Sequence, residues 1–188
     1  MCRGQKSDQK ENINEACKLE KEKEVNQWVE EWVDTLSEAD PQTNGIPLCP
    51  FAKPAWHKGH VDVQKSQDLW DLVFREVDKF DGTHKVVMCV QEEPEQDYFE
   101  LEAACGALNR WFAATGLDIW LLAYQEDRAI VFIQTLSDLD DAADTLQKLG
   151  YYKHYSDADY QRLIEQRRKL RRRNEDAWND ARKENADG

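Results

Sequence analysis

Apolar side chains recur along much of the chain at the spacing of an amphipathic helix, i, i+3, i+4 and i+7. The first such stretch carries Trp28 and Trp32 on its apolar stripe, and Ser66 is in place to cap the second. Gly116 and Gly150 follow two later stretches, where a left-handed residue commonly closes a helix. The pattern therefore predicts helices over residues 25–36, 66–80, 97–115 and 137–149.

Shorter runs rich in β-branched residues lie between and after these helices. The run at 85–90 is apolar without alternation, which is typical of a strand covered on both faces. The segment 125–128 is short enough to join the last two strands in a hairpin. The sequence therefore predicts strands at 60–64, 85–90, 118–124 and 129–135.

The order of these elements predicts an α/β (α+β) fold, a two-layer sandwich of ferredoxin-like character. We expect a sheet of about four strands with helices mainly on one face, flanked by N- and C-terminal helices. Residues 1–20 are polar and are expected to form a mobile tail, and residues 21–156 are expected to form one domain. Residues 157–188 are predicted to be a charged C-terminal helix and tail.

Charge narrows the choice of partners. The net charge of −13 at pH 7 disfavours nonspecific binding to nucleic acid or to anionic membranes. Seven Lys and Arg residues between Arg162 and Arg173 are the only feature that favours nucleic acid. Acidic residues flank this basic run, so we expect its helix to dock on the protein's own acidic surface or on that of a protein partner.

Two further features of composition bear on the compartment. No segment approaches the roughly 20 consecutive apolar residues that a membrane-spanning helix requires. The five cysteines are odd in number and widely scattered, which indicates free thiols in a reducing, cytoplasmic environment. Seven tryptophans leave room for an exposed aromatic face and for self-association.

The most distinctive segment for chemistry is 45–60, which holds three of the five prolines and two of the four histidines. Cys49, His57 and His60 are its candidate catalytic residues, with Cys49 as nucleophile and a histidine as acid or base. A nucleophilic thiol needs a pKa lowered by a nearby base or cation. A cysteine between apolar neighbours is also typical of a small buried hydrophobe, so both interpretations stay open.

The same segment offers two other kinds of site. Lys53 and Trp56 belong to a locally cationic stretch that would suit a small anionic ligand, although surface charges balanced by acidic neighbours are the simpler interpretation. Cys49, His57 and His60 would be the ligands of a metal, if any, but their spacing is not a recognised zinc pattern and we favour no metal. The sequence leaves any cofactor unknown, and it has no glycine-rich phosphate loop.

The segment Leu48-Cys49-Pro50-Phe51-Ala52, after a helix with tryptophans, resembles an uncharacterised bacterial family, the domain of unknown function 1415 (DUF1415). The helix and strand over residues 97–124 are also similar to that family, so the resemblance covers about residues 25–124. The chain departs from the family at Tyr124-Gln125-Glu126, where members usually have Phe-His-Pro. The resemblance implies a fold and no established activity.

Two functions follow from these patterns as hypotheses. In the first, the protein binds a small ligand or catalyses a reaction in a pocket lined by the 49–60 loop. In the second, it is a non-enzymatic interaction protein that binds a protein partner through its charged terminal helices. The direction in which Cys49, His57 and His60 point distinguishes the two.

Overall fold

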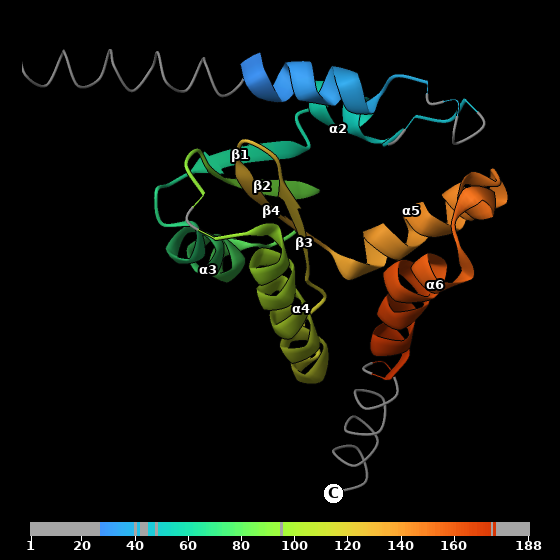
Figure 1. Cartoon of the computed structure of the whole chain (residues 1–188). Coiled ribbons are helices and arrows are strands. Elements are labelled where there is room, and N and C mark those ends of the chain that lie inside the picture. The colour runs from blue at the N-terminus through green and yellow to red at the C-terminus, as the bar shows by residue number, and fades with distance from the viewer. Residues whose placement is uncertain are drawn as a thin grey trace, which may run out of the picture.

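A four-stranded mixed sheet lies at the centre of the computed structural model (Figure 1). The structure describes residues 27–39, 41, 45–47, 49–94, 96–173 and 175, and the tail expected over residues 1–20 lies outside them. The strand order is β1-β2-β4-β3, with β1 parallel to β2 and β4 antiparallel to both of its neighbours. The strands are β1 (Val61–Lys65), β2 (Val86–Gln91), β3 (Trp120–Gln125) and β4 (Ala129–Gln134).

Three of these strands form a split β-α-β unit. The chain runs from β2 through α4 (Tyr98–Thr115) to β3, and β4 then returns between β2 and β3. This unit is the building block of ferredoxin-like folds. The remaining strand, β1, precedes the unit and is parallel to β2, so a complete ferredoxin-like arrangement is not confirmed. The predicted α+β class with a four-stranded sheet is confirmed.

The helices α3 (Leu69–Lys79) and α4 cover one face of the sheet (Figure 1). Their apolar stripes pack on the side chains that β2, β3 and β4 direct to that face, among them Cys89, Leu121 and Val131. The buried amide of Asn109 on α4 also bonds both backbone groups of Leu121, at 2.7 and 2.8 Å. Because β3 is an edge strand, this pairing satisfies backbone groups that would otherwise lack a partner.

The opposite face of the sheet carries the N-terminal helix, residues 27–36, and the short helix α2 (Ala52–His57) (Figure 1). Val29 and Val33 are buried there against Met88, Val90 and Ile130. Helices on both sides explain why β2 is buried along nearly its whole length, as its unbroken apolar run predicts.

Two local predictions need correction. The segment 49–60 was expected to be a loop, but it contains α2, because Pro54 falls in the first helical turn, where its missing N–H costs nothing. Asp68, and not Ser66, caps α3 and accepts from the Asp71 N–H at 2.9 Å. Ser66 instead accepts from the Asp68 N–H at 3.1 Å, so it supports the turn before the helix.

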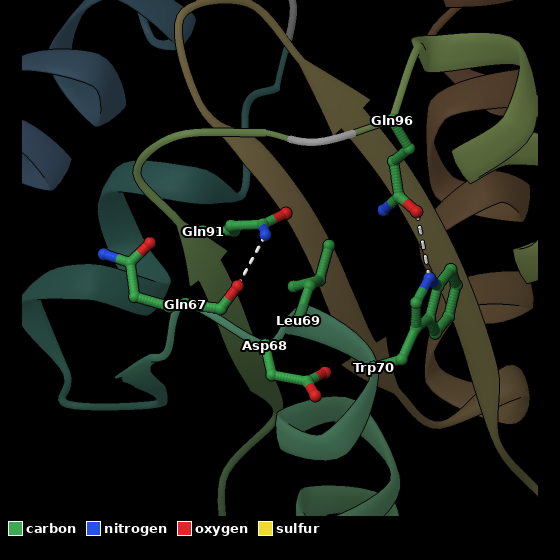
Figure 2. Close-up of a pocket in the computed structure, with 6 residues that line it drawn as sticks. All are labelled: Gln67, Asp68, Leu69, Trp70, Gln91 and Gln96. Atoms are coloured by element: carbon green, nitrogen blue, oxygen red, sulfur yellow. Dashed lines mark hydrogen bonds between the residues drawn. The ribbon is translucent and has the colours of Figure 1, made fainter.

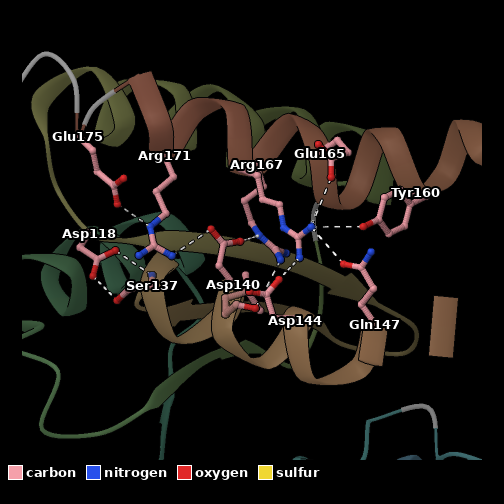
Figure 3. Close-up of polar contacts among 12 residues, drawn as sticks. Asp118, Ser137, Asp140, Asp144, Gln147, Tyr160, Glu165, Arg167, Arg171 and Glu175 are labelled. Atoms are coloured by element: carbon pink, nitrogen blue, oxygen red, sulfur yellow. Dashed lines mark hydrogen bonds and ion pairs between the residues drawn. The ribbon is translucent and has the colours of Figure 1, made fainter. Parts of the chain in front are cut away.

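Beyond the sheet, α5 (Leu136–Lys148) leads through a short 3₁₀ turn, Tyr151–His154, into a helix that runs from α6 (Asp157–Tyr160) to residue 173. Figure 3 shows how this C-terminal helix docks on α5. Asp140 accepts from Arg167 at 2.8 Å and from Arg171 at 3.3 Å, and Arg168 pairs with Asp144. The basic run thus lies on the protein's own acidic surface.

Within the described part of the chain, no helix combines the length and apolarity needed to cross a membrane.

Candidate functional site

A pocket of about 300 Å³ opens where β1 and β2 end. The chain enters α3 directly after β1 and approaches α4 after β2, so both connections border the pocket. Sites at the carboxyl ends of parallel strands are common in α/β proteins, because the connecting loops converge there. The lining residues, drawn in Figure 2, are Gln67, Asp68, Leu69, Trp70, Gln91 and Gln96.

Gln91, the last residue of β2, is the most buried polar group of this pocket. Its residue surface is only 3% exposed. The side-chain Nε2 donates to the backbone carbonyl of Gln67 at 2.6 Å. Since that carbonyl can only accept, the amide oxygen of Gln91 must be the end that points away from it. Figure 2 shows this oxygen directed into the pocket, and no donor among the described residues bonds to it.

Gln96 faces Gln91 from the segment that precedes α4. Its Oε1 accepts from the indole N–H of Trp70 at 3.0 Å, and its backbone carbonyl accepts from the Gln125 amide at 3.0 Å. These two bonds hold the segment against α3 and β3. Figure 2 shows the Gln96 amide nitrogen pointing back across the pocket toward Gln91.

The remaining walls combine apolar and charged groups. Leu69 is buried at the start of α3, and the half-buried Trp70 ring forms the side nearest Gln96 (Figure 2). Asp68 supplies a carboxylate at the exposed rim, although one of its oxygens is used as the helix cap. Lys65 and Glu92 form an ion pair of 3.7 Å next to the rim. The pocket therefore offers an uncharged polar interior beside an apolar wall.

The residues predicted from the sequence do not line this pocket. Cys49 is a half-buried free thiol, and burial raises its pKa, an effect that backbone N–H groups of Phe51 and Ala52 partly offset. A raised pKa is the opposite of what a nucleophilic thiolate needs. His57 is exposed and His60 is half-buried. No hydrogen bond links these three side chains in the described ranges, and their catalytic roles remain predictions.

The two predicted ligand-binding residues are also engaged elsewhere. Lys53 forms an exposed ion pair of 2.8 Å with Asp34 on the N-terminal helix. Trp56 packs against the apolar cluster beneath that helix. Among the residues that the structure describes, no group of three or more His, Cys, Asp or Glu side chains could hold a metal. The metal alternative for Cys49, His57 and His60 therefore gains no support from their positions.

Sequence reasoning missed the glutamines because each is paired with a residue far along the chain. Gln91 bonds to a residue 24 positions away, and Trp70 to one 26 positions away. One signal was present in the sequence: Gln91 directly ends the apolar run of a strand that was predicted to be covered on both faces. A polar residue at the end of such a strand is placed where loops converge.

Comparisons with protein-family models, with curated proteins and with solved structures each found no match. The resemblance to DUF1415 therefore stays a prediction.

Proposed function

We propose that this protein binds a small polar ligand in the pocket at the carboxyl ends of β1 and β2. The observation that carries the proposal is the Gln91 amide, which is almost fully buried and has an acceptor oxygen facing the pocket. Gln91 Oε1 is not one of the described side-chain atoms that are both buried and without a partner, so it borders the open pocket and is accessible to a donor that enters it. A ligand that donates a hydrogen bond to this oxygen would gain up to about 1.5 kcal/mol of binding free energy.

The pocket also has the size and mixed lining of a small-molecule site. Its volume of about 300 Å³ lies at the lower end of typical ligand pockets, so the ligand would be a single ring or a molecule of similar size. Leu69 and Trp70 provide apolar contact, while Gln91 and Gln96 provide oriented polar groups.

The two earlier hypotheses have weaker support. A small anionic ligand beside Lys53 and Trp56 would compete with the Lys53–Asp34 ion pair and would be open to solvent. For an interaction through the charged C-terminal helix, most of the basic side chains of that helix already pair within the chain. Intramolecular ion pairs occupy Arg162, Arg167, Arg168, Arg171 and Arg172.

The proposal is tested by a fragment screen with ligand-observed NMR on three proteins: the unmodified protein, Gln91→Met and Gln67→Ala. Methionine keeps the approximate volume of Gln91 and removes the acceptor. Gln67→Ala is the matched control, because Gln67 accepts from Gln91 through its main-chain carbonyl, which the substitution keeps, and its side chain points away from the pocket (Figure 2).

We expect fragments that bind the unmodified protein and Gln67→Ala equally, and that bind Gln91→Met at least about tenfold more weakly. A screen without binders, or binders that Gln91→Met retains at full affinity, would refute the proposed function.

A further inference from the structure

We infer that the ligand of this pocket carries an uncharged amide group, whose N–H donates to Gln91 and whose carbonyl accepts from Gln96. The inference rests on the proposed function and specifies the chemical class of the ligand. The orientation of each side-chain amide is fixed by a partner that can only accept or only donate a hydrogen bond.

Gln91 presents an acceptor and not a donor. A side-chain amide can turn over and exchange its oxygen and nitrogen, so its orientation has to be decided by its partners. The Gln67 carbonyl, 2.6 Å away, has no proton to donate, so it requires the Gln91 nitrogen. The oxygen is thereby fixed on the pocket side.

Gln96 presents the opposite polarity by the same reasoning. The indole N–H of Trp70 can only donate, and it lies 3.0 Å from the Gln96 side chain, so it requires the amide oxygen there. The two N–H groups of the Gln96 nitrogen are then left over. Figure 2 shows this nitrogen on the pocket side, facing the Gln91 oxygen.

A ligand between the two glutamines must therefore donate on one side and accept on the other. A carboxylate has acceptors only and would leave the Gln91 oxygen unpaired. An amidinium or ammonium group has donors only and would leave the Gln96 nitrogen unpaired. An amide has one group of each kind, and a planar ring attached to it would lie against Leu69 and Trp70, the apolar residues of the lining.

Three molecules of nearly equal shape separate these cases: benzamide, benzoate and benzamidine. Their dissociation constants for the unmodified protein are measured by NMR titration. We expect benzamide to bind at least about tenfold more tightly than either of the other two, which is the effect of one neutral hydrogen bond.

The variant Gln96→Glu provides the sharper test. Glutamate keeps an oxygen for the Trp70 N–H and replaces the free donor by an acceptor. The preference should then change from benzamide to benzamidine, which donates to both sides. Gln67→Glu is the control for charge, because it adds the same carboxylate on a side chain that points out of the pocket (Figure 2), and it should keep the preference for benzamide.

Equal binding of benzamide and benzoate, or of benzamide and benzamidine, would overturn the amide assignment, as would fragments that bind while benzamide does not. A change of preference in Gln67→Glu equal to that in Gln96→Glu would overturn it as well. These results differ from failure of the proposed function, in which no fragment of any class depends on Gln91.

Discussion

Two polar regions of this protein are buried to a similar degree but differ in how fully their hydrogen bonds are satisfied. Between α5 and the C-terminal helix, Asp140 and Arg167 are both almost inaccessible, and each finds an opposite charge within the chain (Figure 3). Arg171 adds a second donor to Asp140. In the pocket, Gln91 is equally buried, but only one end of its amide has a partner.

This difference separates a structural network from a binding site. The charges at α5 stabilise each other, so removing one leaves its partner buried and unpaired. The side-chain amides of Gln91 and Gln96 make one hydrogen bond each, and the other end of each amide is available for a ligand. The basic run stands out in the sequence, yet it belongs to the structural region.

The largest effect is expected from Asp140→Asn. The substitution keeps the shape of the side chain and removes the charge that Arg167 and Arg171 share. Removing one partner of a buried ion pair typically costs about 3–5 kcal/mol, and the free energy of unfolding should fall by that amount. Urea denaturation followed by tryptophan fluorescence measures it, and a cost below about 1 kcal/mol would show that the C-terminal helix is not held as described.

Gln91→Met should separate stability from binding. The free energy of unfolding should fall by only about 1–2 kcal/mol, because one neutral hydrogen bond to Gln67 is lost. Fragment binding should weaken far more in relative terms. If the variant unfolded as readily as Asp140→Asn, the Gln91 amide would belong to a structural network, and the contrast between the two regions would disappear.

Lys85→Met tests an exposed ion pair between Asp138 on α5 and Lys85, which precedes β2. Lys85 lies 2.8 Å from Asp138, and both side chains are about half exposed. The hydrogen bond from Lys85 lowers the pKa of Asp138 below its ordinary value. A group with a lowered folded-state pKa stabilises above its unfolded pKa, and this stability is lost as pH falls through the folded value.

For this exposed pair the expected cost at pH 7 is less than about 1 kcal/mol. The difference between Lys85→Met and the unmodified protein should vanish in acid, below the ordinary pKa of an aspartate. Denaturation at pH 7 and at successively lower pH checks this, and a difference that grew toward low pH would contradict the assigned direction.

The smallest expected effect is the reaction of the cysteine thiols with an alkylating reagent at pH 7. A reactive Cys49 would move the functional site to the 45–60 segment and away from the pocket at Gln91. Burial raises the pKa of Cys49, and it raises those of Cys89 and Cys105 to about 12, so few of these thiols are ionised at pH 7. Alkylation, mapped cysteine by cysteine with mass spectrometry, should be slower at Cys49 than in a free cysteine peptide and should accelerate as pH rises above 9. Rapid labelling of Cys49 at pH 7 would refute this.

The sequence predicts the features that local patterns determine. The left-handed Gly116 that ends α4 and the buried strand β2 are both found where the sequence places them. The helix α2 was missed because three prolines in 45–60 suggested a loop, although Pro54 sits in a first turn that tolerates it. The pocket could not be predicted, because Gln91, Gln96 and Trp70 are brought together by strand pairing and helix packing across long stretches of chain.

Titration of ¹⁵N-labelled protein with benzamide tests most directly whether the side-chain oxygen of Gln91 and the side-chain nitrogen of Gln96 bind a ligand. The indole N–H of Trp70 and the side-chain amide of Gln96 share a hydrogen bond and report on the pocket. We predict that both signals shift and saturate together, while the side-chain amide of Gln67, which points away, stays in place. Unchanged Trp70 and Gln96 signals at saturating benzamide, or shifts confined to the 45–60 segment, would contradict the claim.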